Sequence, residues 1–137
     1  MDSPIKLGCI IDDDNMYISL LKKIIELKKL CQNLLVFSNG KEALDHFKSI
    51  LPGNDADKIP EIIFLDVNMP VMDGWQFLEE FLEIENKTKK SITIYVVSSS
   101  IDPKDYKKAK TFSSVTDYLI KPINISKIEE IFTRDSA

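Results

Sequence analysis

Reactive side chains follow four of the five apolar runs in this sequence. Asp12 and Asp13 follow the first run, and Asp66 ends the third. Ser98 ends the fourth run, and Lys121 follows the fifth. If the runs are strands of one parallel sheet, these side chains reach the edge where open α/β sheets bind their ligands. Each residue alone could cap a turn, end a strand or be solvated, but their joint placement is much harder to assign to chance.

The three carboxylates predict a bound cation. Acidic groups that crowd together repel one another, and they persist if a cation sits among them. The donors are oxygen atoms, which indicates Mg²⁺, and the one histidine, His46, is expected at the surface of a helix far from this edge. A divalent ion, a hydroxyl and an ammonium around one carboxylate suit phosphoryl transfer to that carboxylate. In this scheme Asp66 attacks in line, Ser98 donates a hydrogen bond, and Lys121 neutralises charge on the phosphoryl oxygens.

Five apolar runs alternate with five amphipathic segments. The predicted strands span 6–11, 33–37, 61–66, 91–97 and 116–120. The predicted helices span 15–29, 39–50, 73–86, 102–112 and 124–132. This alternation is typical of a parallel sheet with right-handed crossovers and helices on both faces. We therefore expect an α/β fold in which the strands carry the reactive side chains to one edge.

Helical spacing predicts which residues face the core. In the first helix these residues are Tyr17, Leu20, Leu21, Ile24 and Leu27. In the third helix they are Trp75, Leu78, Phe81 and Leu82. The helix 102–112 offers only Tyr106, Ala109 and Phe112, so we expect it to be weakly held. The segments 51–58 and 87–90 are predicted to be a solvated loop and a solvated turn.

Composition narrows the class of protein. With 137 residues and 44% hydrophobic content, the chain suits one domain with a real core. A net charge of −4 argues against a nucleic-acid-binding surface. Two cysteines, no signal peptide and no apolar run that could span a bilayer are typical of a cytoplasmic protein. Because the sequence stops after the fifth predicted helix, we expect a single domain over 1–137 with no output domain.

Four groups of residues together carry a family resemblance. They are Ile10-Ile11-Asp12-Asp13; Asp66 with Asn68-Met69-Pro70 and Met72-Asp73-Gly74; Ser98 after Val96-Val97; and Tyr118-Leu119-Ile120-Lys121-Pro122. Over nearly its whole length the chain resembles the receiver domain of bacterial two-component response regulators, in particular the stand-alone type that resembles chemotaxis regulators. The resemblance implies a flavodoxin-like, doubly wound sheet of five parallel strands in the order 2-1-3-4-5, with five helices.

The resemblance also implies roles around the carboxylates. Asp66 resembles the acceptor of a phosphoryl group from a sensor histidine kinase or a histidine phosphotransfer protein. Asp13, Asp66 and the backbone carbonyl of Asn68 resemble the ligands of Mg²⁺. Asp12 resembles an acid that acts mostly through water. Ser98 resembles the hydroxyl that follows the phosphoryl group.

The last strand is implied to report the charge change. Lys121 resembles the partner of the phosphoryl group, joined to Pro122 by a cis peptide bond. Tyr118 resembles an aromatic switch that swings inward when Ser98 moves. Asn68 and Ser100 occupy positions that tune self-dephosphorylation in the family, which leaves the lifetime of the phosphorylated form open.

The implied output is a face of the domain. We expect phosphorylation to change the surface formed by residues 102–112, 116–120 and 124–132. This surface would then bind a downstream protein or a second copy of the chain, without nucleic acid or membrane. The chain is not expected to be an enzyme beyond self-phosphorylation from small donors and self-dephosphorylation. A phosphorelay intermediate, or a sink for phosphoryl groups, is the alternative to a switch.

Three other classes of protein share parts of this pattern. Phosphatases of the haloacid-dehalogenase type also use an Asp at a strand end. They require a second Asp two residues later, where this chain has Asn68, which cannot act as an acid or base. Flavodoxin-like flavin proteins carry a phosphate loop after the first strand, where this chain has acids. A degenerate receiver that serves only as a scaffold would not need the intact set of acids.

Overall fold

The computed structural model describes residues 5–53, 56–69, 71–85 and 92–136. Its strands and helices are β1 (Leu7–Ile11), α1 (Asn15–Leu27), β2 (Asn33–Phe37), α2 (Gly40–Ile50), β3 (Ile62–Asp66), α3 (Gly74–Glu85), β4 (Thr93–Ser98), α4 (Pro103–Lys110), β5 (Val115–Ile120) and α5 (Ile125–Ser136). Within the described residues, the predicted alternation of five strands and five helices is confirmed. The predicted loop 51–58 contains two short 3-10 helices, η1 (Leu51–Gly53) and η2 (Ala56–Lys58). The predicted turn 87–90 lies outside the described residues.

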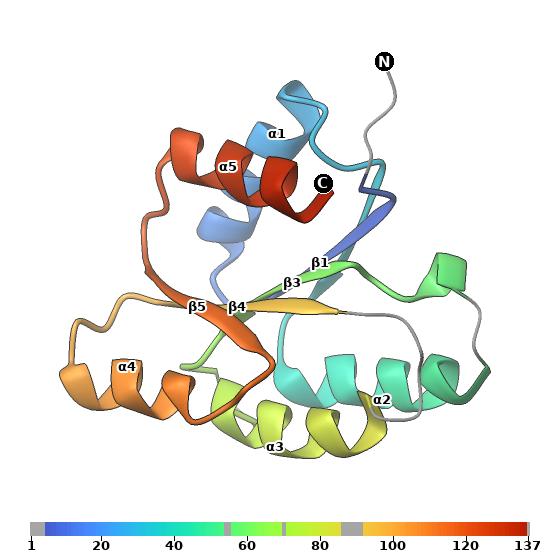
Figure 1. Ribbon diagram of the computed structural model, residues 1–137, viewed down its shortest axis with the longest axis vertical. Helices are drawn as coiled ribbons and strands as arrows, with labels where there is room; N and C mark the ends of the chain where they lie inside the picture. Colours follow the sequence, from blue (N-terminus) through green and yellow to red (C-terminus); the bar gives the residue numbers. More distant parts are fainter. Residues whose placement is uncertain (1–4, 54–55, 70, 86–91, 137) are drawn as a thin grey trace.

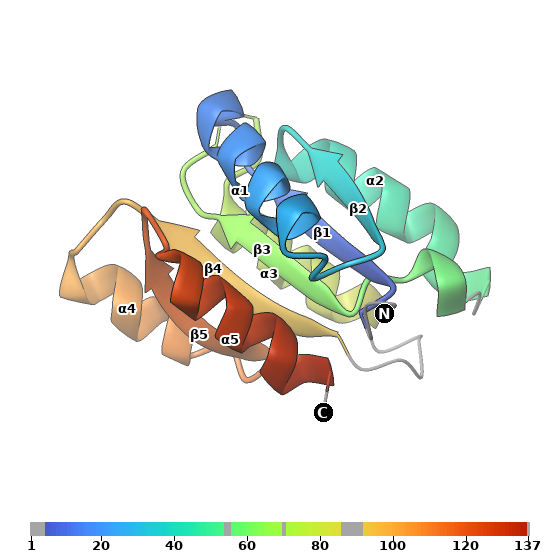
Figure 2. The same ribbon diagram turned by 90° about the horizontal axis from the view of Figure 1, so that it is seen from above.

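The strands form one parallel sheet in the order β2-β1-β3-β4-β5. Helices α1 and α5 cover one face of the sheet, and α2, α3 and α4 cover the other (Figure 1). Figure 2 shows the molecule from above, with α1 and α5 in front of the sheet. This is the flavodoxin-like arrangement that the resemblance implies. Every residue of β1 and β3 is buried, so the two strands that carry the carboxylates are fixed by packing on both faces.

Aromatic rings fill the core on both sides of the sheet. On the side of α2 and α3, Phe47 packs edge-on against Phe77 and Phe81, with ring centroids 6.3 and 5.3 Å apart. On the side of α1 and α5, Phe64 of β3 stacks on Tyr95 of β4 at 5.9 Å. All five side chains are fully buried. Such close-packed interiors resist small displacements, so the sheet is a stable support for the residues at its edge.

Two residues of α1 that were predicted to face inward are exposed. Leu20 is 53% exposed and Leu27 is 72% exposed, whereas the buried residues are Ile18, Leu21 and Ile25. The buried set is spaced i, i+3 and i+7 and therefore lies on one face of the helix. Leu21 is buried as predicted, and Tyr17 and Ile24 pack against the core. The sequence of α1 carries apolar residues on two overlapping stripes, so periodicity alone did not exclude Leu20 and Leu27.

Helix α4 is held mainly by aromatic contacts at its edges. Ala109 is its one buried residue. Tyr106, predicted to face inward, is 47% exposed and meets the ring of Tyr118 edge-on, with centroids 6.0 Å apart. Phe112, just after α4, stacks on Trp75 of α3 at 6.1 Å. The prediction that this helix has a poor apolar face is confirmed.

None of the described helices combines the length and the apolar character that crossing a membrane requires.

Candidate functional site

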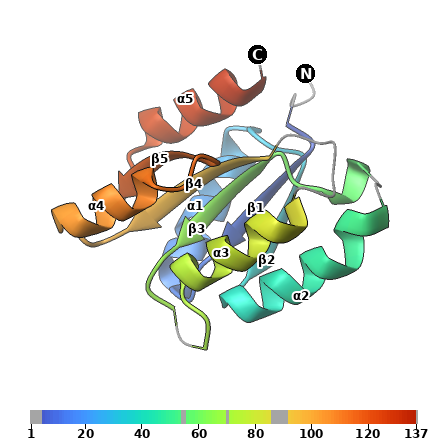
Figure 3. The same ribbon diagram turned by 60° about the horizontal axis from the view of Figure 1, so that its bottom comes forward.

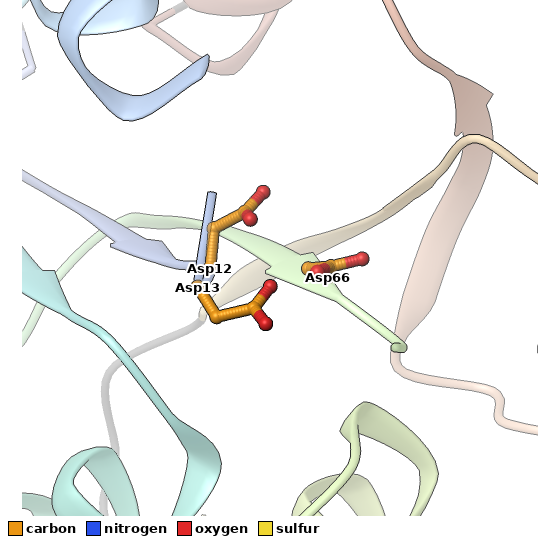
Figure 4. A group of neighbouring side chains, drawn as sticks. All are labelled: Asp12, Asp13 and Asp66. Carbon is orange, nitrogen blue, oxygen red and sulfur yellow. The ribbon is translucent and has the colours of Figure 1, made fainter. Parts of the chain in front are cut away.

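Three carboxylates converge at the carboxyl ends of β1 and β3. The parallel register pairs Ile11 with Leu65, so Asp12 and Asp13 follow β1 at the point where Asp66 ends β3 (Figure 4). One carboxylate oxygen from each Asp lies within 4.8 Å of the others. Asp12 and Asp66 are buried, and Asp13 is exposed. The predicted meeting of the three acids at one edge is therefore present in the structure.

Lys121 enters the site from the end of β5. Its backbone N–H donates to the carbonyl of Ser98 at 2.8 Å, which fixes its position beside β4. Its Nζ lies 2.8 Å from Oδ2 of Asp12 and 3.9 Å from Oδ2 of Asp66. The Lys121–Pro122 peptide bond is cis, as the resemblance implies. The ammonium reaches two of the three clustered carboxylates, so it offsets only part of their negative charge.

The electrostatics of Asp66 follow from this crowding. Burial raises the pKa of its carboxyl from the usual 3.8 to about 7, and the charges of Asp12 and Asp13 act in the same direction. Lys121 and the backbone N–H of Asn68, which donates to Oδ1 of Asp66 at 3.3 Å, oppose the rise. A bound dication would favour the ionised form for the same reason that Lys121 does. The cluster of oxygen donors fits a hard cation such as Mg²⁺, which needs only one or two carboxylates.

Gly74 joins α3 to the backbone of Asp66. The Gly74 N–H donates to the carbonyl of Val67 at 3.0 Å. A Cβ at position 74 would lie 2.5 Å from the backbone oxygen of Asp66 and 2.7 Å from Cα of Val67. Asp73 and Gln76 then cap the helix, each side chain accepting from the other's backbone N–H. Gly74 is therefore required because α3 begins in contact with the strand end that presents Asp66.

A short chain of hydrogen bonds runs from β4 to β5. The buried Ser98 hydroxyl oxygen accepts from the backbone N–H of Ser100 at 3.1 Å. The Tyr118 hydroxyl donates to the carbonyl of Ser100 at 2.8 Å. The Tyr118 ring is only 8% exposed. The inward position that the resemblance assigns to Tyr118 after a switch is thus already occupied in this structure.

Asn68 and His46 are two further residues whose positions were predicted from the sequence. Asn68 lies two residues after Asp66 and is exposed, and its backbone N–H donates to Oδ1 of Asp66. His46 lies away from the cluster on α2, where it packs against Phe37 and Phe47 at 5.2 and 5.6 Å. It is half-buried instead of a plain surface residue.

One residue at the site was missed by the sequence reasoning. Tyr17 of α1 was assigned to the core face of its helix, but Lys121 Nζ lies 4.6 Å from the centroid of its ring. The signal that could have found it is its place one helical turn after Asp13, on a helix that begins at the acidic edge.

Comparison with known proteins identifies the family of the chain. Residues 9–133 match the response regulator receiver domain. The chain therefore belongs to the response regulator receiver domain family, which acts in two-component signalling.

Individual relatives match over different shares of their length. The sensor histidine kinase CheAY of Helicobacter pylori is 34% identical over 112 residues, which are 82% of this chain and 13% of that protein. A two-component response regulator from Cytophaga hutchinsonii superposes with a TM-score of 0.79 at 26% identity, covering 96% of each chain. The receiver domain of Saccharomyces cerevisiae Ssk1, solved with the phosphotransfer protein Ypd1, gives 0.80 at 21% identity, covering 99% of this chain and 92% of that one. The last likeness shows the fold alone.

Proposed function

We propose that this protein accepts a phosphoryl group on Asp66 from a phosphohistidine, in the presence of Mg²⁺, and signals through its α4–β5–α5 face. The observation that carries the proposal is the meeting of three carboxylates within 4.8 Å, with an ammonium that reaches two of them. A role for Asp66 as a turn cap would not require two further carboxylates and an ammonium beside it.

The transfer step uses groups that the site holds. A carboxylate oxygen of Asp66 attacks phosphorus, and the P–N bond of the phosphohistidine breaks. The electron pair of that bond stays on the imidazole nitrogen, and Asp66 becomes an acyl phosphate. Lys121 turns from Asp12 toward the phosphoryl oxygens and stabilises their charge. The Ser98 hydroxyl donates a hydrogen bond to one of them.

The cation would be held by the acids of β1 and β3. Asp13 and Asp66 would bind it through carboxylate oxygens, Asn68 through its backbone carbonyl, and Asp12 mostly through water. When bound, Mg²⁺ supplies positive charge to the phosphoryl oxygens. The exposed side of Asp13 leaves room for the waters that Mg²⁺ usually keeps.

The donor and the target are proteins in this proposal. A sensor histidine kinase or a histidine phosphotransfer protein presents the phosphohistidine, and the Ssk1 receiver complexed with Ypd1 is one example of such a pair. The output passes through Ser98 and Ser100 to Tyr118, because these residues already form one hydrogen-bonded chain. A downstream protein or a second copy of the chain would then bind the α4–β5–α5 face with a different affinity.

Intact-mass measurement tests the acceptor. Incubation with phosphoramidate and Mg²⁺ should add one phosphoryl group to the wild type and none to Asp66→Asn. Asp45→Asn is the matched control, because Asp45 is an exposed carboxylate on α2 that pairs with Lys41 at 3.0 Å. Undiminished labelling of Asp66→Asn, or full labelling in excess chelator, would contradict the proposal.

A further inference from the structure

Tyr17 places an aromatic ring against the ammonium of Lys121. The ring belongs to the first turn of α1, and its centroid lies 4.6 Å from Lys121 Nζ. The side chain is half-buried, and its hydroxyl is buried without a hydrogen-bond partner among the described residues. The proposed transfer step gives this residue no role.

The surroundings of Lys121 show what such a ring can do. Two carboxylates attract its ammonium, at 2.8 Å from Asp12 and 3.9 Å from Asp66. Neither carboxylate limits how the long, flexible stem turns, because an ammonium can bond in many directions. An aromatic face adds a cation–π attraction and excludes water from one side of the charge. The Lys121 side chain is accordingly only 14% exposed.

The phenol of Tyr17 acts on the position of the Lys121 ammonium and does not neutralise its charge. Burial, followed by the negative charge of Asp12 and Asp66, raises the pKa of Tyr17 above its usual value. The ring therefore stays neutral at physiological pH and cannot neutralise Lys121. What it offers is a π face 4.6 Å from the ammonium.

We propose that Tyr17 is a positioning residue for Lys121, whose ring face keeps the ammonium where it can pass from Asp12 to a phosphoryl group on Asp66. The proposal rests on the proposed function for its consequence, but the contact itself is independent of phosphorylation. It assigns the effect to the ring and none to the hydroxyl. Tyr17→Phe should therefore preserve the effect, and Tyr17→Leu should remove it.

The contact is tested first by NMR on the unphosphorylated protein. The ring current of Tyr17 should move the Lys121 ε-methylene resonances upfield, in the wild type and in Tyr17→Phe. The resonances should return to the ordinary lysine position in Tyr17→Leu. This arm decides the positioning claim even if Asp66 accepts no phosphoryl group. Ordinary lysine shifts in the wild type would overturn the proposal.

The consequence is tested by phosphorylation rates with phosphoramidate. The maximal rate should fall about three- to tenfold in Tyr17→Leu, the range expected from losing one shielded cation–π contact, with little change in the half-saturating donor concentration. Tyr17→Phe should keep the wild-type rate. In a Lys121→Ala background, Tyr17→Leu should cause no further loss, because the two residues act as one unit.

Two outcomes of the rate measurements would overturn the proposal. An equal loss in Tyr17→Phe and Tyr17→Leu would assign the effect to the hydroxyl. An equal loss of rate from Tyr17→Leu in the wild type and in the Lys121→Ala background would show that the ring acts independently of the ammonium. If Tyr17→Leu unfolds, Tyr17→Met takes its place, since Met fills irregular space without a π face.

Discussion

Helices α2 and α4 lie in the same layer of the molecule, yet they are attached very differently. Figure 3 shows both helices on the same side of the sheet as α3, in front of the strands. Helix α2 buries Gly40, Ala43, Leu44 and Phe47, whereas α4 buries Ala109 alone. The first helix is part of the core. The second is held at its margins by rings from α3 and β5.

The difference indicates which of the two helices needs less energy to open. The rings that hold α4 belong to elements that touch the site: Trp75 follows Gly74, and Tyr118 bonds to Ser100. A change at Asp66 therefore has short routes to α4, through the neighbours of Trp75 and of Tyr118. Elements with few buried contacts are the ones that open most easily.

The largest expected effect comes from removing the ring that anchors α2. Phe47→Ala should lower the free energy of unfolding by about 3–5 kcal/mol, because it removes a fully buried aromatic side chain and leaves a cavity. Tyr106→Ala on α4 should cost about 1 kcal/mol, since its ring is half exposed. Urea unfolding curves measure both. Equal costs would remove the contrast between the two helices.

The second largest effect is expected from a substitution at the junction between β3 and α3. Gly74→Ala should cost about 1–3 kcal/mol and displace Asp66, because the added Cβ would lie 2.5 Å from the Asp66 backbone oxygen. The extent of Asp66 phosphorylation should fall together with the free energy of unfolding. Gly53→Ala is the matched control, because a Cβ there meets no other atom within 4 Å. A Gly74→Ala protein that is as stable and as readily phosphorylated as the control would refute the steric account.

The charge of Asp66 should set a pH dependence in chelator. The folded-state pKa of about 7 lies above the usual 3.8, so the folded protein holds this proton more tightly than the unfolded chain. The contribution to stability is full below about pH 4 and declines as pH rises through 7. Asp66→Asn should remove this decline and gain about 1–2 kcal/mol at pH 8. Urea unfolding between pH 5 and 8 measures it, with Asp45→Asn as control, and identical slopes in wild type and Asp66→Asn would contradict it.

The smallest expected effect is a local change in amide exchange that distinguishes α4 from α2. Tyr118→Phe removes the hydrogen bond to Ser100 but keeps the ring. Losing one partly buried bond, worth about 1 kcal/mol, should speed amide exchange in α4 about fivefold and leave α2 unchanged. The acceptance of a phosphoryl group by Asp66 should persist. Equal acceleration in the two helices would show that Tyr118 supports the whole fold and not α4 in particular.

The sequence predicted the site better than it predicted the helix faces, for a physical reason. A parallel sheet brings all strand ends to one edge, so Asp12, Asp66 and Lys121 could be placed together from strand order alone. The faces of α1 depend on which of two apolar stripes meets the sheet, and Leu20 was assigned to the wrong one. The contact between Tyr17 and Lys121 joins α1 to the residue after β5, a long-range packing detail that no local pattern encodes.

The single tryptophan of the sequence gives this molecule a built-in optical probe. Trp75 stacks on Phe112 at an interplanar angle of 11°, and Lys108 Nζ lies 5.2 Å from its ring centroid. Its emission therefore reports on one junction, between α3 and α4, with no background from elsewhere in the chain. Time-resolved emission after mixing with a phosphodonor would record any change at this junction in the unlabelled protein, as a kinetic trace to set beside the rate at which mass is gained.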